Sequence, residues 1–266
     1  FFQAEDGIRD GHVTGVQTML FPPTVSKLLQ IIGKNNVNAT IKKYQNNIIN
    51  FNVTESLKWI QRSKYAPKIA KEFISYLDKD ITLRPLNQVK LIMKIEGILK
   101  DDTWNNFASQ KNRVVMWQWY CICALMVPII NELKKRFKNI LNNKFMYTDG
   151  STPRDIKNFL EMQGNHKEAV IVEVDLSKQD INTEDNLIKV EMELHRLFGM
   201  NPAILRWWST IHKKWKFKST TYSGYEKSTR QSGSATTAYG NVITNITTNL
   251  DLIYRNLSHF ICMIML

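Results

Sequence analysis

The spacing of hydrophobic residues divides the chain into a helical first part and a mixed later part. Between residues 22 and 72 apolar side chains recur at helical intervals, as at Val25, Leu28 and Ile32, which predicts helices that bury one face. Residues 89–94 instead mix apolar and basic side chains in alternation. This pattern predicts a strand with cations on one face, and a solvated edge strand is the simplest explanation of that face.

Two more boundaries follow from the same kind of pattern. The apolar run 114–130 is short for a membrane span and is interrupted by a glutamine and a proline, so we expect a buried strand followed by a helix. Further along, Thr152, Pro153 and Asp155 provide a capping hydroxyl, a proline at the first helical position and a carboxylate in the first turn. They predict a helix that ends near Gly164.

A strand, an acidic turn and a helix are predicted after residue 168. Residues 169–176 are β-branched and apolar, broken by Glu173, and they deliver Asp175 near the end of the strand. Residues 184–198 place their apolar side chains on one helical face, with Gly199 as the expected end. An aspartate at the end of a strand is usually a turn former or a helix cap, so Asp175 alone does not indicate a metal site.

A second cluster lies in residues 230–245, where Ser232-Gly233 is followed by Thr237 and Asn241. Gly233 allows the backbone to approach a ligand closely. Thr237 and Asn241 are four residues apart, so both fall on one face of the helix that the loop begins. Taken alone, a helix start built from small residues explains the same pattern.

Composition and charge narrow the class of partner. Hydrophobic residues make up 43% of the 266 residues, as in an ordinary globular protein. Lys and Arg number 36 against 24 Asp and Glu, a formal charge of +12, which favours a polyanionic partner such as nucleic acid. The three cysteines indicate neither a disulfide framework nor a zinc site.

Residues 206–230 concentrate the basic character. Seven lysines and arginines alternate there with tryptophan, phenylalanine and tyrosine. Cations that neutralise phosphates and aromatic rings that stack on bases would make an RNA-binding surface. An amphipathic helix and hairpin with its aromatic rings in the core explains the segment equally well. His195 and His212 have no nucleophile to pair with and receive no catalytic role.

The first twenty residues, FFQAEDGIRDGHVTGVQTML, look like a translated sequencing adapter and are set aside. They contain one arginine and three acidic residues. The basic character therefore belongs to the rest of the chain.

The two clusters in this order resemble the RNA-directed RNA polymerases of positive-strand RNA viruses, most closely the alphavirus-like group that includes the plant virgaviruses. The resemblance extends over about residues 91–266. Palm motif A corresponds to residues 174–180 and motif B to residues 230–241, and residues 144–153 are similar to the segment before motif A.

This resemblance implies an α+β right-hand polymerase fold. Residues 21–165 would form partial fingers with a basic element like motif F, and residues 166–266 a palm with motifs A and B and a fingers insertion between them. Motif C, the Gly-Asp-Asp hairpin that completes the metal site, does not occur in the sequence, and neither does a thumb. We therefore expect a piece truncated before motif C, inactive by itself, of a protein that synthesises RNA with two metal ions.

The resemblance also implies roles for individual residues. Asp175 would be the catalytic carboxylate and a ligand of Mg²⁺ or Mn²⁺, with the carbonyl of Leu176 as a further ligand. Asp180 and Asn241 would face the 2′-hydroxyl of the incoming nucleotide. The other residues expected to contact or support the substrate are Lys94, Lys100, Lys111, Arg113, Arg230, Ser232, Gly233 and Thr237.

The implied partners are an RNA template and product, ribonucleoside triphosphates and other viral replication proteins. The family works in the host cytoplasm on membranes, and the sequence shows no membrane anchor. A reverse transcriptase is disfavoured because it carries an aromatic residue where Asp180 stands. The remaining alternatives are a non-catalytic basic RNA-binding module and the remnant of an integrated viral polymerase.

Overall fold

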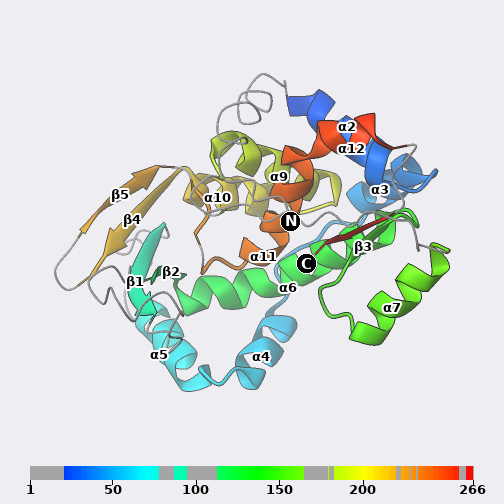
Figure 1. Cartoon of the computed structure of the whole chain (residues 1–266). Helices are drawn as coiled ribbons and strands as arrows, with labels where there is room; N and C mark the ends of the chain where they lie inside the picture. The colour runs from blue at the N-terminus through cyan, green and yellow to red at the C-terminus, as the bar shows by residue number, and fades with distance from the viewer. Residues whose placement is uncertain are drawn as a thin grey trace, which may run out of the picture.

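The protein, seen in a computed structural model, combines helices with two small β-sheets (Figure 1). The structure describes residues 21–77, 87–94, 113–164, 179, 183–219, 223–227, 229–231, 233–257 and 262–265. The helices are α2 (Phe21–Ile32), α3 (Val37–Asn46), α4 (Val53–Arg62), α5 (Ala66–Leu77), α6 (Tyr120–Ile140), α7 (Pro153–Met162), α9 (Asp185–Leu197), α10 (Pro202–His212), α11 (Thr237–Thr248) and α12 (Leu250–Arg255). The strands are β1 (Gln88–Lys94), β2 (Arg113–Gln118), β3 (Phe145–Tyr147), β4 (Lys214–Lys218), β5 (Ser223–Lys227) and β6 (Met263–Met265).

The local signals in the sequence place several of these elements correctly. α7 begins with a capping box in which the Thr152 side chain accepts from the Asp155 N–H, and the Asp155 carboxylate accepts from the Thr152 N–H. α9 is followed by Gly199 in the left-handed region, at φ 81°. A Cβ atom at Gly199 would also overlap the carbonyl oxygen of Tyr44, so this turn requires glycine. The predicted strand over 169–176 lies outside the described residues.

The larger sheet has the strand order β2-β1-β4-β5. β1 is antiparallel to β2 and parallel to β4, and β4 and β5 form an antiparallel hairpin. β1 therefore lies inside the sheet, and the expectation of a solvated edge strand for residues 89–94 is wrong. Its Lys90 lies 4.2 Å from the centre of the Trp119 ring, so an aromatic contact explains that cation better than a bare edge does.

The smaller sheet pairs two strands from distant parts of the chain. β3 and β6 run parallel, with Phe145 opposite Met263 and Tyr147 opposite Met265. The Thr148 N–H donates to the carbonyl of Met265 at 3.0 Å, which continues the pairing. Met263–Met265 near the end of the sequence thus pair with the segment that precedes motif A.

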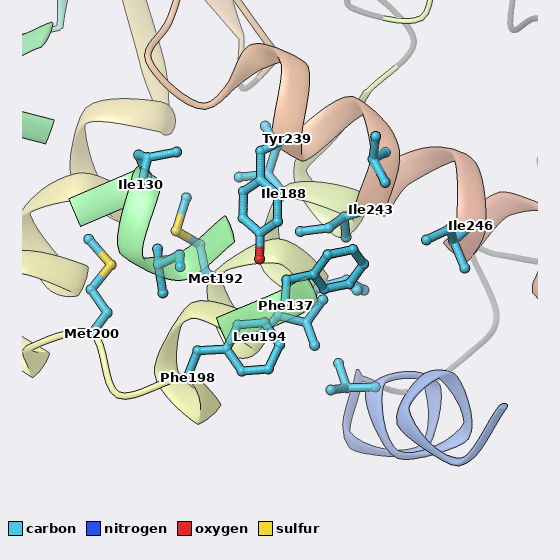
Figure 2. Close-up of a cluster of buried hydrophobic side chains, with 14 of the residues drawn as sticks. Ile130, Phe137, Ile188, Met192, Leu194, Phe198, Met200, Tyr239, Ile243 and Ile246 are labelled. Atoms are coloured by element: carbon cyan, nitrogen blue, oxygen red, sulfur yellow. The ribbon is translucent and has the colours of Figure 1, made fainter. Parts of the chain in front are cut away.

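The core gathers around α6, which crosses the middle of the molecule (Figure 1). Figure 2 shows Phe137 of α6 among side chains of α9 and α11. The Phe137 ring lies 5.7 Å from that of Tyr239 and 6.4 Å from that of Phe198, measured between ring centroids. This packing joins the helix that follows the motif A segment to the helix of motif B. Among the helices that the structure describes, none is long and apolar enough to cross a membrane.

The segment between the motifs forms α10 and the β4–β5 hairpin. Trp208 and Trp215 are fully buried, and the Trp215 indole N–H donates to the carbonyl of Thr229 at 2.9 Å. Tyr225 is 60% exposed, with the ammonium of Lys214 at 4.2 Å from its ring. The core explanation therefore holds for these two tryptophans, whereas the hairpin presents a basic and aromatic surface.

Candidate functional site

The predicted site residues fall into two sets. Those outside the described residues are Lys100, Lys111, Asp175, Leu176, Asp180 and Ser232. Those that the structure describes are Lys94, Arg113, Arg230, Gly233, Thr237 and Asn241. The geometry below concerns the second set and its neighbours.

The loop before α11 is attached to strand β2. The backbone of Gly233 forms a parallel bridge with Trp117, and its N–H donates to the carbonyl of Met116 at 2.9 Å. A Cβ atom at this position would lie 2.5 Å from the Met116 oxygen. Glycine is needed here for close approach to the protein's own strand, and its contact with a ligand stays a prediction.

Thr237 closes the same loop at the start of α11. Its hydroxyl lies 2.6 Å from the carbonyl oxygen of Gln231 and 3.0 Å from that of Ser234. The hydroxyl has one proton, which it donates to the nearer oxygen, that of Gln231. We call residues 230–237 the B loop, and this bond fixes its two ends together.

Arg230, the first residue of the B loop, points into the interior. Its Nη2 donates to Oε2 of Glu191 at 2.5 Å and lies 3.5 Å from the hydroxyl of Thr244. Both charged side chains are 1% exposed. A contact between this guanidinium and a substrate would require it to leave Glu191, so the substrate contact predicted for Arg230 stays a prediction.

The surroundings keep this pair ionised and the nearby histidine neutral. Burial alone would raise the pKa of Glu191, but the Arg230 guanidinium holds it below its ordinary value. Burial lowers the pKa of His195 to about 4, although Glu191 opposes the shift from 3.7 Å. The His195 ring stacks on Tyr239 at 5.7 Å and 12°. The pair therefore lies in the interior beside this stack, with both side chains almost fully removed from solvent.

His212 is neutral for a related reason. Burial lowers its pKa to about 4, and a hydrogen bond to the Trp208 carbonyl only partly opposes this. That bond joins Nδ1 to the oxygen at 2.9 Å. Because a carbonyl oxygen only accepts, the proton of the neutral ring lies on Nδ1. His212 thus supports the packing of α10 and β4.

Asn241 connects the motif B helix to the motif A segment. Of residues 165–182, the structure describes Gln179, whose side-chain amide donates to the Asn241 carbonyl at 2.7 Å. Gln179 lies between Asp175 and Asp180 in the sequence. The two clusters that the sequence singled out therefore meet at this bond.

The larger sheet brings two of the predicted basic residues together. Lys94 at the end of β1 is the register partner of Arg113 at the start of β2. Lys100 and Lys111 lie in the sequence between them, outside the described residues. Since β2 also contacts Gly233, one strand joins this basic element to the B loop.

The predicted metal ligands are outside the part of the chain whose placement is described. Within the described ranges, no group of three or more His, Cys, Asp or Glu side chains could hold a metal ion. The chemistry of the predicted donors, a carboxylate and a carbonyl oxygen, suits a hard cation such as Mg²⁺.

A polar groove of about 710 Å³ lies between α4 and α6, and none of the predicted site residues lines it. Several of its cations pair with acidic residues that also line it, as in Lys58 with Glu55 and Lys135 with Glu132. Because it shares no residue with the predicted site, we do not include this groove in the site.

Sequence reasoning missed Glu191, the partner of Arg230. The signal was present, because Glu191 lies four residues after Leu187 and three before Leu194 on the apolar face of its helix. A carboxylate on a buried face requires a partner. Which cation supplies it depends on contacts across the fold, and the sequence alone does not show them.

Comparison with known proteins gives a consistent result. A model of the family described as RNA dependent RNA polymerase matches residues 14–266. The chain is 24% identical over 207 residues to the replicase large subunit of tomato brown rugose fruit virus, a match that covers 76% of this chain and 12% of that protein. It is 29% identical over 126 residues to the replicase large subunit of pepper mild mottle virus (strain Spain), covering 46% of this chain and 8% of that protein.

A third relative, the replicase large subunit of tobacco mosaic virus (strain B935A), is 24% identical over 167 residues, which cover 61% of this chain and 10% of that protein. The chain spans about a tenth of the length of the curated relatives it matches. The family match covers nearly all of the sequence and confirms the resemblance to viral polymerases of the alphavirus-like group. The chain belongs to the RNA-dependent RNA polymerase family.

Proposed function

We propose that the chain carries part of the palm and fingers of an RNA polymerase that copies an RNA template by nucleotidyl transfer at two metal ions. The observation that carries the proposal is the hydrogen bond from Gln179 to the Asn241 carbonyl. It brings Gln179, which lies between Asp175 and Asp180 in the sequence, against the motif B helix. A nucleotide bound there would have its phosphates near Asp175 and its sugar near Asp180 and Asn241.

In this proposal Asp175 holds the metal ions, with the Leu176 carbonyl as a further ligand. Bound Mg²⁺ or Mn²⁺ would neutralise charge on the attacking and leaving oxygens as the primer 3′-hydroxyl attacks the α-phosphate and pyrophosphate departs. The carboxylate of Asp175 fixes where that charge is bound. The chain by itself does not polymerise, because one carboxylate segment is not enough to hold two ions in register.

Asp180 and Asn241 read the sugar. Hydrogen bonds from these side chains to the 2′-hydroxyl would separate ribonucleotides from deoxyribonucleotides, since a site built to bond a hydroxyl is left unpaired by a substrate without it. Ser232 and Gly233 border the sugar from the B loop, and Thr237 keeps that loop closed. The attachment of Gly233 to β2 holds the backbone of this loop in a fixed position.

The basic residues attract the triphosphate. Lys94 and Arg113, which are register partners of β1 and β2, begin and end a segment that also carries Lys100 and Lys111. Together these four cations would neutralise the phosphates of the incoming nucleotide. Arg230, which is 1% exposed and paired with Glu191, would reach the triphosphate only if that pair opened.

The protein would act on an RNA template, on the growing product and on ribonucleoside triphosphates, with other viral replication proteins. We place its work in the host cytoplasm, in replication complexes associated with membranes. A basic RNA-binding module without catalytic activity is the rival, and the exposed basic hairpin β4–β5 favours RNA binding under either account.

Nucleotide binding separates the two accounts, whereas salt-dependent RNA binding does not. The purified chain is titrated with ATP and with dATP, with and without Mg²⁺. We expect binding that needs Mg²⁺ and prefers ATP by about tenfold or more. Asp175→Asn should remove the Mg²⁺ dependence and Asn241→Ala the preference for ribose. RNA binding without ribose-selective nucleotide binding would favour the rival.

A further inference from the structure

We propose that Glu191 is a positioning residue: its buried pair with Arg230 holds the B loop in place and thereby sets how strongly the site prefers ribose. The preference itself belongs to the proposed function, so this second half of the inference rests on it. The first half, the control of the loop by Glu191, rests on the contacts of the structure alone.

The pair is an expensive way to fill the interior. Both side chains are 1% exposed and 2.5 Å apart, and two apolar side chains of similar volume would often serve stability as well or better. An ionic pair adds a fixed position, because a guanidinium that moved away from its carboxylate would leave an unpaired charge in the interior. The pair therefore restricts where the backbone of Arg230 can lie.

That backbone belongs to the B loop. The backbone carbonyl of Gln231, the next residue, accepts a hydrogen bond from the Thr237 hydroxyl. The N–H of Gly233 donates to the carbonyl of Met116. Thr229, the residue before Arg230, forms an antiparallel bridge with Glu184 at the start of α9. Helix α9 thus holds the entry of the loop twice, through backbone at Glu184 and through charge at Glu191.

The motif B helix leaves space for the same pair. A Cβ atom at Gly240 would overlap the Arg230 guanidinium and lie 2.5 Å from Oε2 of Glu191. The pair therefore packs directly on the backbone of α11, one residue before Asn241. A shift of the guanidinium would disturb the loop and the start of α11 together.

Glu191 links the two segments that carry the motifs. α9 is the helix that follows the motif A segment, and it reaches the B loop through Glu191. The carboxylate thereby couples the two halves of the proposed nucleotide site, although it touches no substrate itself. A change at Glu191 should alter selection of the sugar and leave the folding of distant parts such as helix α7 unchanged.

The test compares Glu191→Gln with Glu193→Gln. Glu193 lies on the same helix and pairs with Arg196 at 2.7 Å, but its side chain is 31% exposed, so it is a matched control. Hydrogen exchange of the purified chain is followed by mass spectrometry in peptides covering residues 229–241 and in helix α7. The ratio of ATP to dATP affinity, with Mg²⁺, is the second readout.

We expect Glu191→Gln to speed exchange of residues 233–240 by about tenfold or more, since local opening follows the contacts that are lost. Helix α7 should exchange as in the wild type, and the ribose preference should fall. Glu193→Gln should leave all three readouts unchanged. Equal exchange of the B loop in the two variants would overturn the positioning role.

A loosened loop with an unchanged ribose preference would overturn the second half of the inference. A wild-type chain with no ribose preference would instead overturn the proposed function, and with it that second half, while the exchange data would still decide the first. If Glu191→Gln does not fold, the double variant Glu191→Met with Arg230→Met replaces it. That variant keeps the volume and removes the charges, and native exchange and selection in it would contradict the proposal.

Discussion

Helix α9 contributes the glutamate of two arginine–glutamate pairs that have similar distances and different surroundings. Glu191 meets Arg230 at 2.5 Å with both side chains 1% exposed, and Glu193 meets Arg196 at 2.7 Å with side chains 31% and 51% exposed. The first pair joins segments far apart in the chain, and the second lies within one turn of the helix. Burial turns the same chemistry from a solvated surface contact into a constraint on the fold.

We expect the largest effect in the stability of two single variants, one at the buried Glu191 and one at the exposed Glu193. Removing one partner of a buried pair leaves an uncompensated charge, so Glu191→Gln should lower the free energy of unfolding by about 3 to 5 kcal/mol. Glu193→Gln should lower it by about 1 kcal/mol or less, because exposed pairs contribute little. Urea unfolding of both variants measures the difference, and equal losses would contradict the contrast.

The histidines on the buried side give a smaller effect that depends on pH. The folded pKa of His195 is about 4, below the ordinary 6.5, so the unfolded chain binds more protons as the pH falls. Stability should therefore be lost as the pH falls from 6.5 toward 4, by about 2 kcal/mol per histidine at pH 5. His212 behaves in the same way.

His195→Gln should flatten this dependence, measured as the free energy of unfolding at pH 7 and pH 5. The pKa of Glu191 is lowered, so protonation of this carboxylate reduces stability only at lower pH and does not change the difference between pH 7 and pH 5. An equally steep dependence in the variant would show that His195 is not neutral in the folded protein.

A substitution at Gly240 of α11 tests how tightly the buried pair is packed. Replacing a helical glycine with alanine usually stabilises by about 1 kcal/mol. Here the added methyl would collide with the Arg230 guanidinium, and overpacking costs about 1 to 3 kcal/mol. Gly240→Ala should therefore destabilise by about 1 kcal/mol in net terms, and a gain in melting temperature would mean that the pair has room to move.

The smallest effect concerns solvent-facing charge. Lys214→Ala in the basic hairpin should weaken RNA binding and reduce the slope of log affinity against log salt by about 1 for a lost phosphate contact. Lys189→Ala on the exposed face of α9, where Lys189 pairs with Asp185 at 2.6 Å, is the control. Identical slopes for both variants would remove the hairpin from the RNA surface.

The sequence predicts the elements of this fold better than the contacts between them. The capping box at Thr152, the end of α9 at Gly199 and the helix from Thr237 follow from local chemistry, and the structure confirms them. The interior position of β1 does not, because strand order is decided by pairing with β4, more than a hundred residues later.

The candidate site divides in the same way. Motif spacing predicts that Thr237 and Asn241 lie on one helix, which the structure confirms as α11, whereas their contacts with a substrate stay a prediction. The partner of Arg230 is 39 residues away in the sequence, and the attachment of Gly233 to β2 crosses an even longer interval. Such contacts arise from packing, which a single sequence records only as an unexpected polar residue on an apolar face.

The most direct test of the proposed function is template-directed RNA synthesis by the chain extended through the codons that follow Leu266 in its source RNA. We predict that these codons soon encode Gly-Asp-Asp, that the extended protein incorporates ribonucleotides on an RNA template, and that Asp175→Asn abolishes incorporation. A stop codon directly after Leu266, or an extended protein that carries Gly-Asp-Asp and incorporates equally well with Asp175→Asn, would contradict the account.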